Sequence, residues 1–289
     1  MGRSSAAGGA VDASRALVRV QRMGGGAGVH MLNKRLVEKR FGRRLQCYRE
    51  EAVVQRKMAG RLADMVVAAL PRRHVSRVLE VGAGSGMLTR ELLSRLSVQW
   101  YAANDLVPEA GRMVEAEAER SGTELSEFIA GDIESLTLDL PGDLDLIVSG
   151  ATLQWLQDLP ALFRRMAGLL KPGGVLAFST FGPENMKEIR QLESVGLHYQ
   201  TLDDLTRMAS GWFDPVSEDV ERHRLSFETP EAVLHHIRYT GVNGVDGGRP
   251  WTRGRYRAFI DRYYRSFPAV DGVRLTYHAL YCCLRKRAE

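Results

Sequence analysis

A glycine-rich stretch, VLEVGAGSG at residues 78–86, is the clearest chemical feature of this sequence. It places Gly82, Gly84 and Gly86 directly after an apolar run, where glycine lets the chain turn sharply and lets a ligand approach the backbone without a Cβ in the way. The helix expected to begin at about Met87 presents its free N–H groups to the same crevice. A nucleotide-like ligand fits such a loop, and a tight turn without a ligand is the alternative.

The spacing of the glycines distinguishes three kinds of nucleotide loop. A dinucleotide fingerprint needs G-x-G-x-x-G, but Met87 stands where its third glycine belongs, because that glycine comes one position early at Gly86. A phosphate loop needs a lysine after the glycines, and none follows. The observed E-x-G-x-G-x-G, which begins at Glu80, resembles the loop of S-adenosylmethionine-dependent methyltransferases. We therefore expect S-adenosylmethionine as the cofactor.

Two aspartates follow the next two expected strands. Asp105 stands where a carboxylate can accept both ribose hydroxyls, and Asp132 can accept from an adenine amino group while Ile133 packs on the ring. Either aspartate alone could cap a helix, but two at successive strand ends favour a binding site. The expected cofactor-binding residues lie on the loop or at strand ends: Glu80, Gly82, Ala83, Gly84, Gly86, Asp105, Leu106, Asp132, Ile133 and Ser149.

Alternating strands and helices position these residues at one edge of a sheet. We expect strands at 76–82, 98–104, 126–131, 144–149 and 174–180, with helices at 87–96, 108–120 and 159–170. Such alternation predicts right-handed β-α-β units and a parallel sheet covered on both faces.

The flanking segments differ in character. A lead-in helix from Leu32 to Leu70 carries an apolar stripe that Pro71 ends. After Phe181 we expect a helix at 184–195, a mixed stretch to about 229, helices at 230–240 and 252–266, and a closing strand, VRLTYHALYCCL. Residues 1–30 are rich in Gly, Ala, Ser and Arg without a hydrophobic period, which predicts disorder. A start codon placed too far upstream, with Met31 the real start, is favoured over a transit peptide.

Bulk properties exclude several classes of protein. No apolar run in the 289 residues approaches the roughly 18 that span a bilayer, so we expect a soluble enzyme and no membrane partner. The three cysteines, Cys47, Cys282 and Cys283, are too few for a disulfide framework and indicate a reducing compartment, the cytoplasm. The formal charge of +5 permits an acidic partner without requiring one.

A longer segment, residues 143–190, takes the interpretation beyond the cofactor. It contains a short polar turn followed by LQW, and a strand that ends in FSTFGP. Together with FGRRLQCYREEAVVQRKMAGRLADM before it and GVNG, WTRG and LTYHALY after it, it resembles the malonyl-acyl-carrier-protein O-methyltransferases of biotin synthesis, over about residues 33–285. One departure is Gly150, where that family commonly has Asn.

The resemblance implies a fold and an activity. The fold would be α/β, a Rossmann-like seven-stranded class I methyltransferase sheet, with an N-terminal lead-in helix and a C-terminal helical cap at about 184–266 inside a domain of residues 31–289. The activity would be methylation of the free carboxylate of malonyl-acyl carrier protein, or malonyl-CoA, by a monomeric enzyme. The nearest alternatives are a methyltransferase of another small carboxylic acid and an assembly factor that acts on a protein partner. The turn SGAT lacks an N-P-P-Y-like stack, which speaks against a nucleic-acid substrate.

Candidate substrate residues follow from the chemistry. A carboxylate nucleophile is ionised near neutral pH and needs no general base, but a cation such as an arginine fork would select and orient it. We expect Arg253 in this role, with Arg164 and Arg190 as alternatives, each of which is otherwise a solvated helix residue. The resemblance places Tyr48 near the reacting end, with packing as its alternative role. Gln154 and Trp155 should lie over the methyl group, and no metal site is expected; arginines in 238–265 could face an acidic carrier.

Overall fold

The computed structural model describes residues 52–193, 197–239 and 252–288, all of which belong to one unit of the chain, Met31–Glu289. The disorder expected for residues 1–30, the start of the lead-in helix and the predicted role of Tyr48 lie outside the described residues. Within the described ranges, no helix combines the length and the apolar character needed to cross a membrane.

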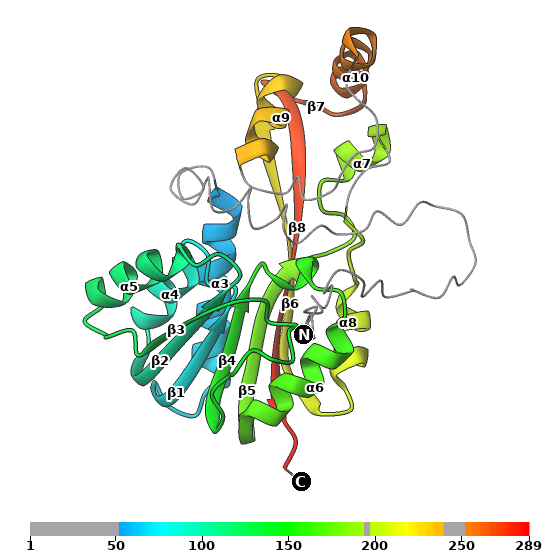
Figure 1. The fold of residues 1–289 in the computed structure, drawn as a ribbon. Coiled ribbons are helices and arrows are strands. Elements are labelled where there is room, and N and C mark those ends of the chain that lie inside the picture. The colour runs from blue at the N-terminus through cyan, green and yellow to red at the C-terminus, as the bar shows by residue number, and fades with distance from the viewer. Residues whose placement is uncertain (1–51, 194–196, 240–251, 289) are drawn as a thin grey trace, which may run out of the picture. The chain divides into compact units, whose positions relative to one another are not determined.

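Eight strands of the described chain form one sheet (Figure 1). They are β1 (His74–Val81), β2 (Ser97–Asp105), β3 (Glu127–Ala130), β4 (Leu144–Gly150), β5 (Leu170–Phe181), β6 (Phe213–Phe227), β7 (Pro268–Ala269) and β8 (Gly272–Lys286). Seven of them, the number that the resemblance implies, follow the order β3-β2-β1-β4-β5-β8-β6, and the two-residue β7 pairs with β8 beside this path. Strands β1 to β5 are parallel to one another, whereas β8 is antiparallel to both β5 and β6.

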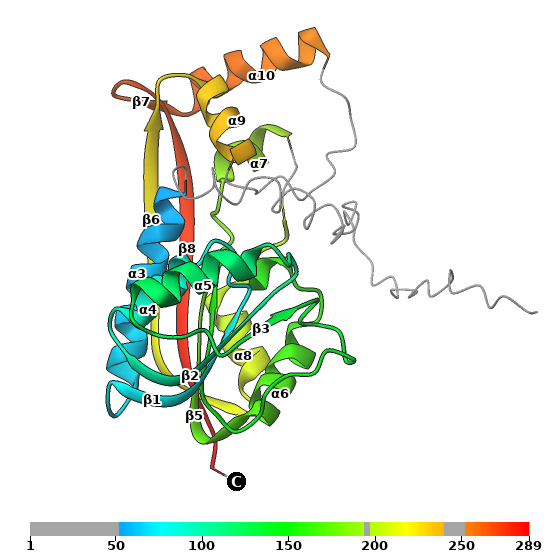
Figure 2. The same cartoon turned by 60° about the vertical axis from the view of Figure 1, so that its left-hand side comes forward.

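Helices cover both faces of the sheet, as the alternation predicts (Figures 1 and 2). One face carries α3 (Val53–Ala69), α4 (Met87–Leu93) and α5 (Ala110–Arg120), and the other carries α6 (Leu159–Leu169) and α8 (Leu202–Ala209). The side chains of β4 alternate between the two cores: Leu146 and Val148 pack on the α3 face, and Ile147 on the α6 face. Each is fully buried, which explains why such strands are nearly continuous apolar runs.

The register of the strands brings the predicted site residues to one edge. Val81, the last residue of β1, is paired with Asn104 on one side and Ser149 on the other. Strand β1 therefore stands where the strand order reverses, with β2 and β3 on one side and β4 and β5 on the other. In an open α/β sheet a ligand crevice forms at this switch point, beyond the carboxyl ends of the strands.

The expected cap differs from the structure in one respect. Residues 213–227, assigned to a mixed stretch inside a helical cap, form the edge strand β6, paired with β8 from Phe213↔Lys286 to Phe227↔Val273. Its side chains alternate between exposed and half-buried, with charged residues on both faces. An edge strand is hydrogen-bonded to a partner on one side only, and most side chains of β6 are polar. Its sequence therefore lacks the alternation of apolar and polar residues by which a strand is recognised.

The remaining cap elements lie beyond the carboxyl ends of the parallel strands (Figures 1 and 2). They are α7 (Lys187–Glu193), α9 (Pro230–Tyr239), α10 (Arg253–Ser266) and β7. The buried carboxylate of Glu188 on α7 accepts hydrogen bonds from the backbone N–H of Thr276, 3.0 Å, and from its hydroxyl, 2.6 Å. This contact fastens α7 to β8, and so the cap to the sheet.

One arginine on α6 supports the loop that follows β3. The guanidinium of Arg165 donates to three backbone carbonyls, those of Ile133 at 2.8 Å, Ser135 at 2.6 Å and Leu138 at 2.5 Å. The backbone of this loop forms turn hydrogen bonds, from Ser135 to Asp132 and from Leu138 to Ser135, and the guanidinium adds a side-chain donor to them. Arg165 thereby holds in place the segment that carries Asp132.

We expect Arg165→Ala to lower the free energy of unfolding by about 1–3 kcal/mol, because three carbonyls lose a charged donor. Urea denaturation measures this, with Arg164→Ala as the matched control, since Arg164 is the exposed neighbour on the same helix. Equal stability of the two variants would contradict the role given to Arg165.

Candidate functional site

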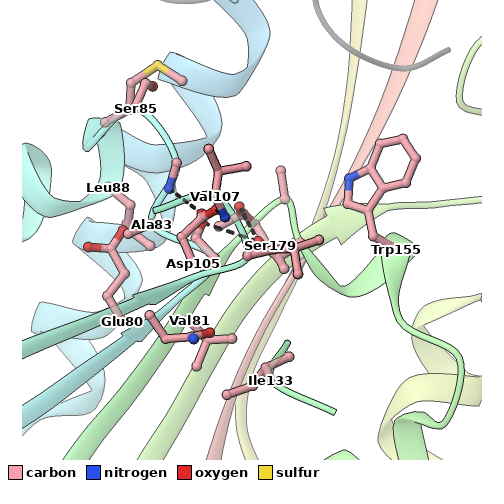
Figure 3. A pocket seen from close by; sticks show the side chains of 18 of the residues that line it. Glu80, Val81, Ala83, Ser85, Leu88, Asp105, Val107, Ile133, Trp155 and Ser179 are labelled. Atoms are coloured by element: carbon pink, nitrogen blue, oxygen red, sulfur yellow. Dashed lines mark hydrogen bonds between the residues drawn. The ribbon is translucent and has the colours of Figure 1, made fainter. Parts of the chain in front are cut away.

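A pocket opens at the carboxyl ends of β1, β2, β4 and β5, against the first turns of α3 (Figure 3). Eight residues expected to bind the cofactor line it: Glu80, Gly82, Ala83, Gly84, Asp105, Leu106, Asp132 and Ile133. Two others are close by but do not line it. Gly86 is the left-handed residue that begins α4, with φ 73°, and the hydroxyl of Ser149 donates to the carbonyl of Val81 at 3.0 Å.

The glycine loop needs its glycines for different reasons. At Gly82, with φ 70°, a Cβ would lie 2.1 Å from the hydroxyl oxygen of Thr152, so the close approach of the β4 turn excludes a side chain. At Gly84, with φ 54°, a Cβ would meet nothing within 4 Å, although the residue lines the pocket. The space beside Gly84 is therefore open to a ligand that approaches the backbone.

Asp105 holds the loop and faces the pocket at once (Figure 3). Its carboxylate accepts from the backbone N–H of Gly84 at 2.7 Å and from that of Val107 at 2.8 Å, one bond at each oxygen. Burial raises the pKa of this carboxyl above its ordinary value, against the effect of these bonds. A carboxylate has about four lone-pair sites, so each oxygen of Asp105 can still accept a hydroxyl from a ligand.

Glu80 lies at the base of the pocket and is almost fully buried. One of its carboxylate oxygens accepts from the hydroxyl of Thr89 on α4 at 2.5 Å and from that of Tyr101 on β2. Burial raises its pKa to about 7 in spite of these bonds. Glu80 therefore joins β1, β2 and α4 beneath the glycine loop.

The turn after β3 forms a further wall. Asn104 fixes it, because its buried amide donates to the carbonyls of Ile129 at 2.8 Å and Gly131 at 3.0 Å. Asp132 accepts from the backbone N–H of Glu134 at 3.0 Å, and Ile133 contributes a buried apolar side chain. The turn thus presents an apolar side chain, Ile133, and a carboxylate, Asp132, to the pocket.

Of the two expected substrate residues that follow β4, one lines the pocket and the other does not. Trp155 lines the pocket, and Figure 3 shows it across the pocket from Glu80. Gln154 does not line it: its amide nitrogen donates to the carbonyl of Ala151 at 2.5 Å, and its amide oxygen accepts from Thr180 at 2.9 Å. The side chain of Gln154 thus stabilises the turn after β4, in which Ala151 takes the left-handed φ of 51°.

Gly150, the departure noted in the sequence, lies at the start of this turn and lines the pocket. A Cβ at this position would come within 3.3 Å of the Leu88 side chain. A larger residue such as Asn would require Leu88 to move, so glycine fits the local packing.

The arginines expected to bind a carboxylate lie elsewhere. Arg253, the first residue of α10, and Arg164 on α6 are exposed, and neither lines the pocket. Arg190 donates to the carbonyl of Pro183 and lies 6.0 Å from the centre of the Tyr199 ring. Within the residues that the structure describes, no lysine, arginine or histidine lines the pocket, so no arginine fork is found there.

Several lining residues were not anticipated. Helix α3 contributes Gln55, Met58 and Ala59, and the end of β5 contributes Ser179. A polar residue within the apolar stripe of the lead-in helix was the signal that could have identified Gln55. Among the residues that the structure describes, the buried hydroxyls of Ser85 and Ser179 find no hydrogen-bond partner, which is unusual in a folded protein.

The strand order, the glycine loop and the two strand-end aspartates together define the class I methyltransferases. Comparison with known proteins agrees, since the family described as "Methyltransferase domain" matches residues 79–178. A candidate methyltransferase of Bacillus halodurans superposes with a TM-score of 0.58 at 16% identity, over 78% of this chain and 99% of that chain, which shows likeness of fold.

Sequence relatives identify the family. A malonyl-[acyl-carrier protein] O-methyltransferase of Prosthecochloris aestuarii is 58% identical over 258 residues, 89% of this chain and 96% of that protein. One of Chlorobium luteolum is 43% identical over 259 residues, 90% of this chain and 98% of that protein. The chain belongs to the malonyl-[acyl-carrier protein] O-methyltransferase family, and it is a methyltransferase.

Asp105→Ala is expected to weaken the binding of S-adenosylhomocysteine by about 1.5–3 kcal/mol, because charge-assisted hydrogen bonds to the ribose and the anchor of the loop are both lost. Calorimetry measures the affinity. Glu119→Ala removes an exposed carboxylate on α5 and serves as the control. Unchanged affinity in Asp105→Ala would exclude Asp105 from the cofactor site.

The raised pKa of Glu80 makes a prediction about stability. Glu80 binds its proton more tightly in the folded state, where its pKa is about 7, than at its ordinary value of 4.5. Its contribution to stability is therefore fully present below pH 4.5 and is lost as the pH rises to about 7. The loss lowers the free energy of unfolding by about 3 kcal/mol.

Glu80→Gln keeps an acceptor but cannot ionise. Urea denaturation at pH 5 and pH 8 should show a smaller decline in the variant, and identical declines would refute the assignment.

Proposed function

We propose that this protein transfers a methyl group from S-adenosylmethionine to the free carboxylate of malonyl-acyl carrier protein, the step that enters biotin synthesis. The observation that carries the proposal is the 58% identity to the relative of that name, which extends over 96% of that protein. A pocket with a glycine loop, strand-end aspartates and an apolar far wall supports it.

The residues present fit the proposed cofactor. The space beside Gly84 admits a ligand against the backbone, and Asp105 retains lone pairs for ribose hydroxyls. Asp132 and Ile133 would hold the adenine, and the unpartnered hydroxyl of Ser85 is available to the polar amino-acid end. When bound, the cofactor supplies a methyl group that its sulfonium has already activated.

The chain itself has little covalent chemistry to perform. A carboxylate oxygen of the substrate forms a bond to the methyl carbon, and the electron pair of the broken C–S bond remains on sulfur, so no proton moves. The enzyme must hold the two groups in line and exclude water. Trp155, Leu156, Met58 and Ala59 supply the apolar surface for this purpose.

The surface of α10 supports a carrier of acidic character. Arg253, Arg257 and Arg265 are exposed along this helix, whereas Arg255 and Arg262 pair with the carboxylate of Glu193. Opposite charge steers the encounter of two proteins and orients them. The proposal therefore favours an acidic carrier protein as the partner.

Mass spectrometry of malonyl-acyl carrier protein after incubation with the enzyme and S-adenosylmethionine tests the proposal. We expect a gain of one methylene on the malonyl carrier and none on succinyl or acetyl carriers, while malonyl-CoA compares the two carriers. Asp105→Ala serves as a loss-of-function control. No gain on the malonyl carrier, with cofactor binding confirmed, would overturn the proposed substrate.

A further inference from the structure

The charge of the pocket raises a question about the substrate. Its described lining contains three acidic residues, Glu80, Asp105 and Asp132, and no basic one. A carboxylate substrate that enters such a pocket meets like charges, which repel it most strongly where water is excluded. Among the described residues, the lining therefore offers neutral hydrogen-bond donors and no cationic side chain to a carboxylate.

Ser179 offers a donor at the required place. It lies at the end of β5, where it pairs with Gly150 of the β4 turn, and Figure 3 shows its side chain between Asp105 and Trp155. Its side chain is on the same face of the sheet as Ala177, the face that α3 covers. Only 1% of Ser179 is exposed, yet no residue that the structure describes gives its hydroxyl a hydrogen-bond partner. An unsatisfied buried hydroxyl is costly, and a ligand in the pocket would satisfy it.

Gln55 offers a second donor, from α3. It stands in the first turn of this helix, which packs on β5, and it lines the same pocket. The residue is 6% exposed, and its side-chain amide can donate to a ligand in the pocket. Ser179 and Gln55 thus contribute two neutral donors to the pocket that Trp155 also lines.

We propose that Ser179 and Gln55 bind the free carboxylate of the substrate by neutral hydrogen bonds, and that the positive charge of the bound cofactor takes the place of an arginine. This rests on the proposed function. Neutral donors orient the carboxylate by hydrogen bonds weaker than the bidentate ion pair of an arginine fork, which would hold back the electron pair of the attacking oxygen more strongly. Attack removes both charges, since the products are an ester and a thioether, so the attraction disappears when the reaction is complete.

Binding of malonyl-acyl carrier protein in the presence of different cofactor analogues tests the role of charge without turnover. Sinefungin carries a protonated amine where the sulfonium stands, and S-adenosylhomocysteine is neutral there. We expect calorimetry to show the malonyl carrier bound at least tenfold more tightly with sinefungin, and the acetyl carrier to show no such preference. Equal affinity of the malonyl carrier with both analogues, or no binding with either, would overturn the proposal.

Substitution of the two donors tests their identity. Ser179→Ala and Gln55→Met should each weaken malonyl-carrier binding in the sinefungin complex, and raise KM, by about 10- to 100-fold, with unchanged affinity for sinefungin itself. Ser179→Thr keeps a hydroxyl and should restore binding. Wild-type carrier affinity in Ser179→Ala and Gln55→Met would overturn the inference. A loss of affinity for sinefungin alone would overturn it as well. Either result would leave the proposed function intact. Failure of the wild-type enzyme to methylate the malonyl carrier would instead reject the proposed function.

Discussion

The attachment of the glycine loop to the end of β2 is the interaction on which the rest of the site depends. The backbone N–H groups of Gly82 and Ala83 both donate to the carbonyl of Asn104, at 2.8 and 3.1 Å. The backbone N–H of Gly84 donates to the carboxylate of the next strand residue, Asp105, at 2.7 Å. Three consecutive loop residues are thus tied to two consecutive strand residues. The loop cannot shift without moving the carboxylate, so the part that approaches the ligand and the part that binds its hydroxyls form one rigid piece.

Buried polar groups extend this piece into the core. The carboxyl of Glu80 receives hydroxyls from α4 and β2, and the amide of Asn104 reaches the turn after β3. Each contact joins elements that are separate in sequence and adjacent in the sheet. Burial of such groups is unfavourable unless every one is satisfied, and here their partners come from the elements that must be held together.

Much of this arrangement could be predicted from the sequence, because it depends on local pattern. Glycine spacing, apolar runs and strand-end aspartates identified the parallel part of the sheet and eight of the residues that line the pocket. Edge strand β6 was missed, since its polar alternation resembles that of a loop. The substrate side was harder, because Ser179 and Gln55 come to the same pocket only through packing of α3 on β5. Arginine was expected from chemistry alone, and none of the three arginines named lines the pocket.

The length of β8 has a consequence for how this enzyme could be re-engineered. Leu284 and Cys282 lie in the core under α6, whereas Val273, Leu275 and Tyr277 pack with Phe259 and Tyr263 of α10 in the cluster that also includes α3. Sheet and cap therefore share one strand and one continuous apolar interior. A chimaera with a different cap could not be spliced at a linker, and its junctions would have to fall within paired strands, where the register of β6 and β8 must be preserved.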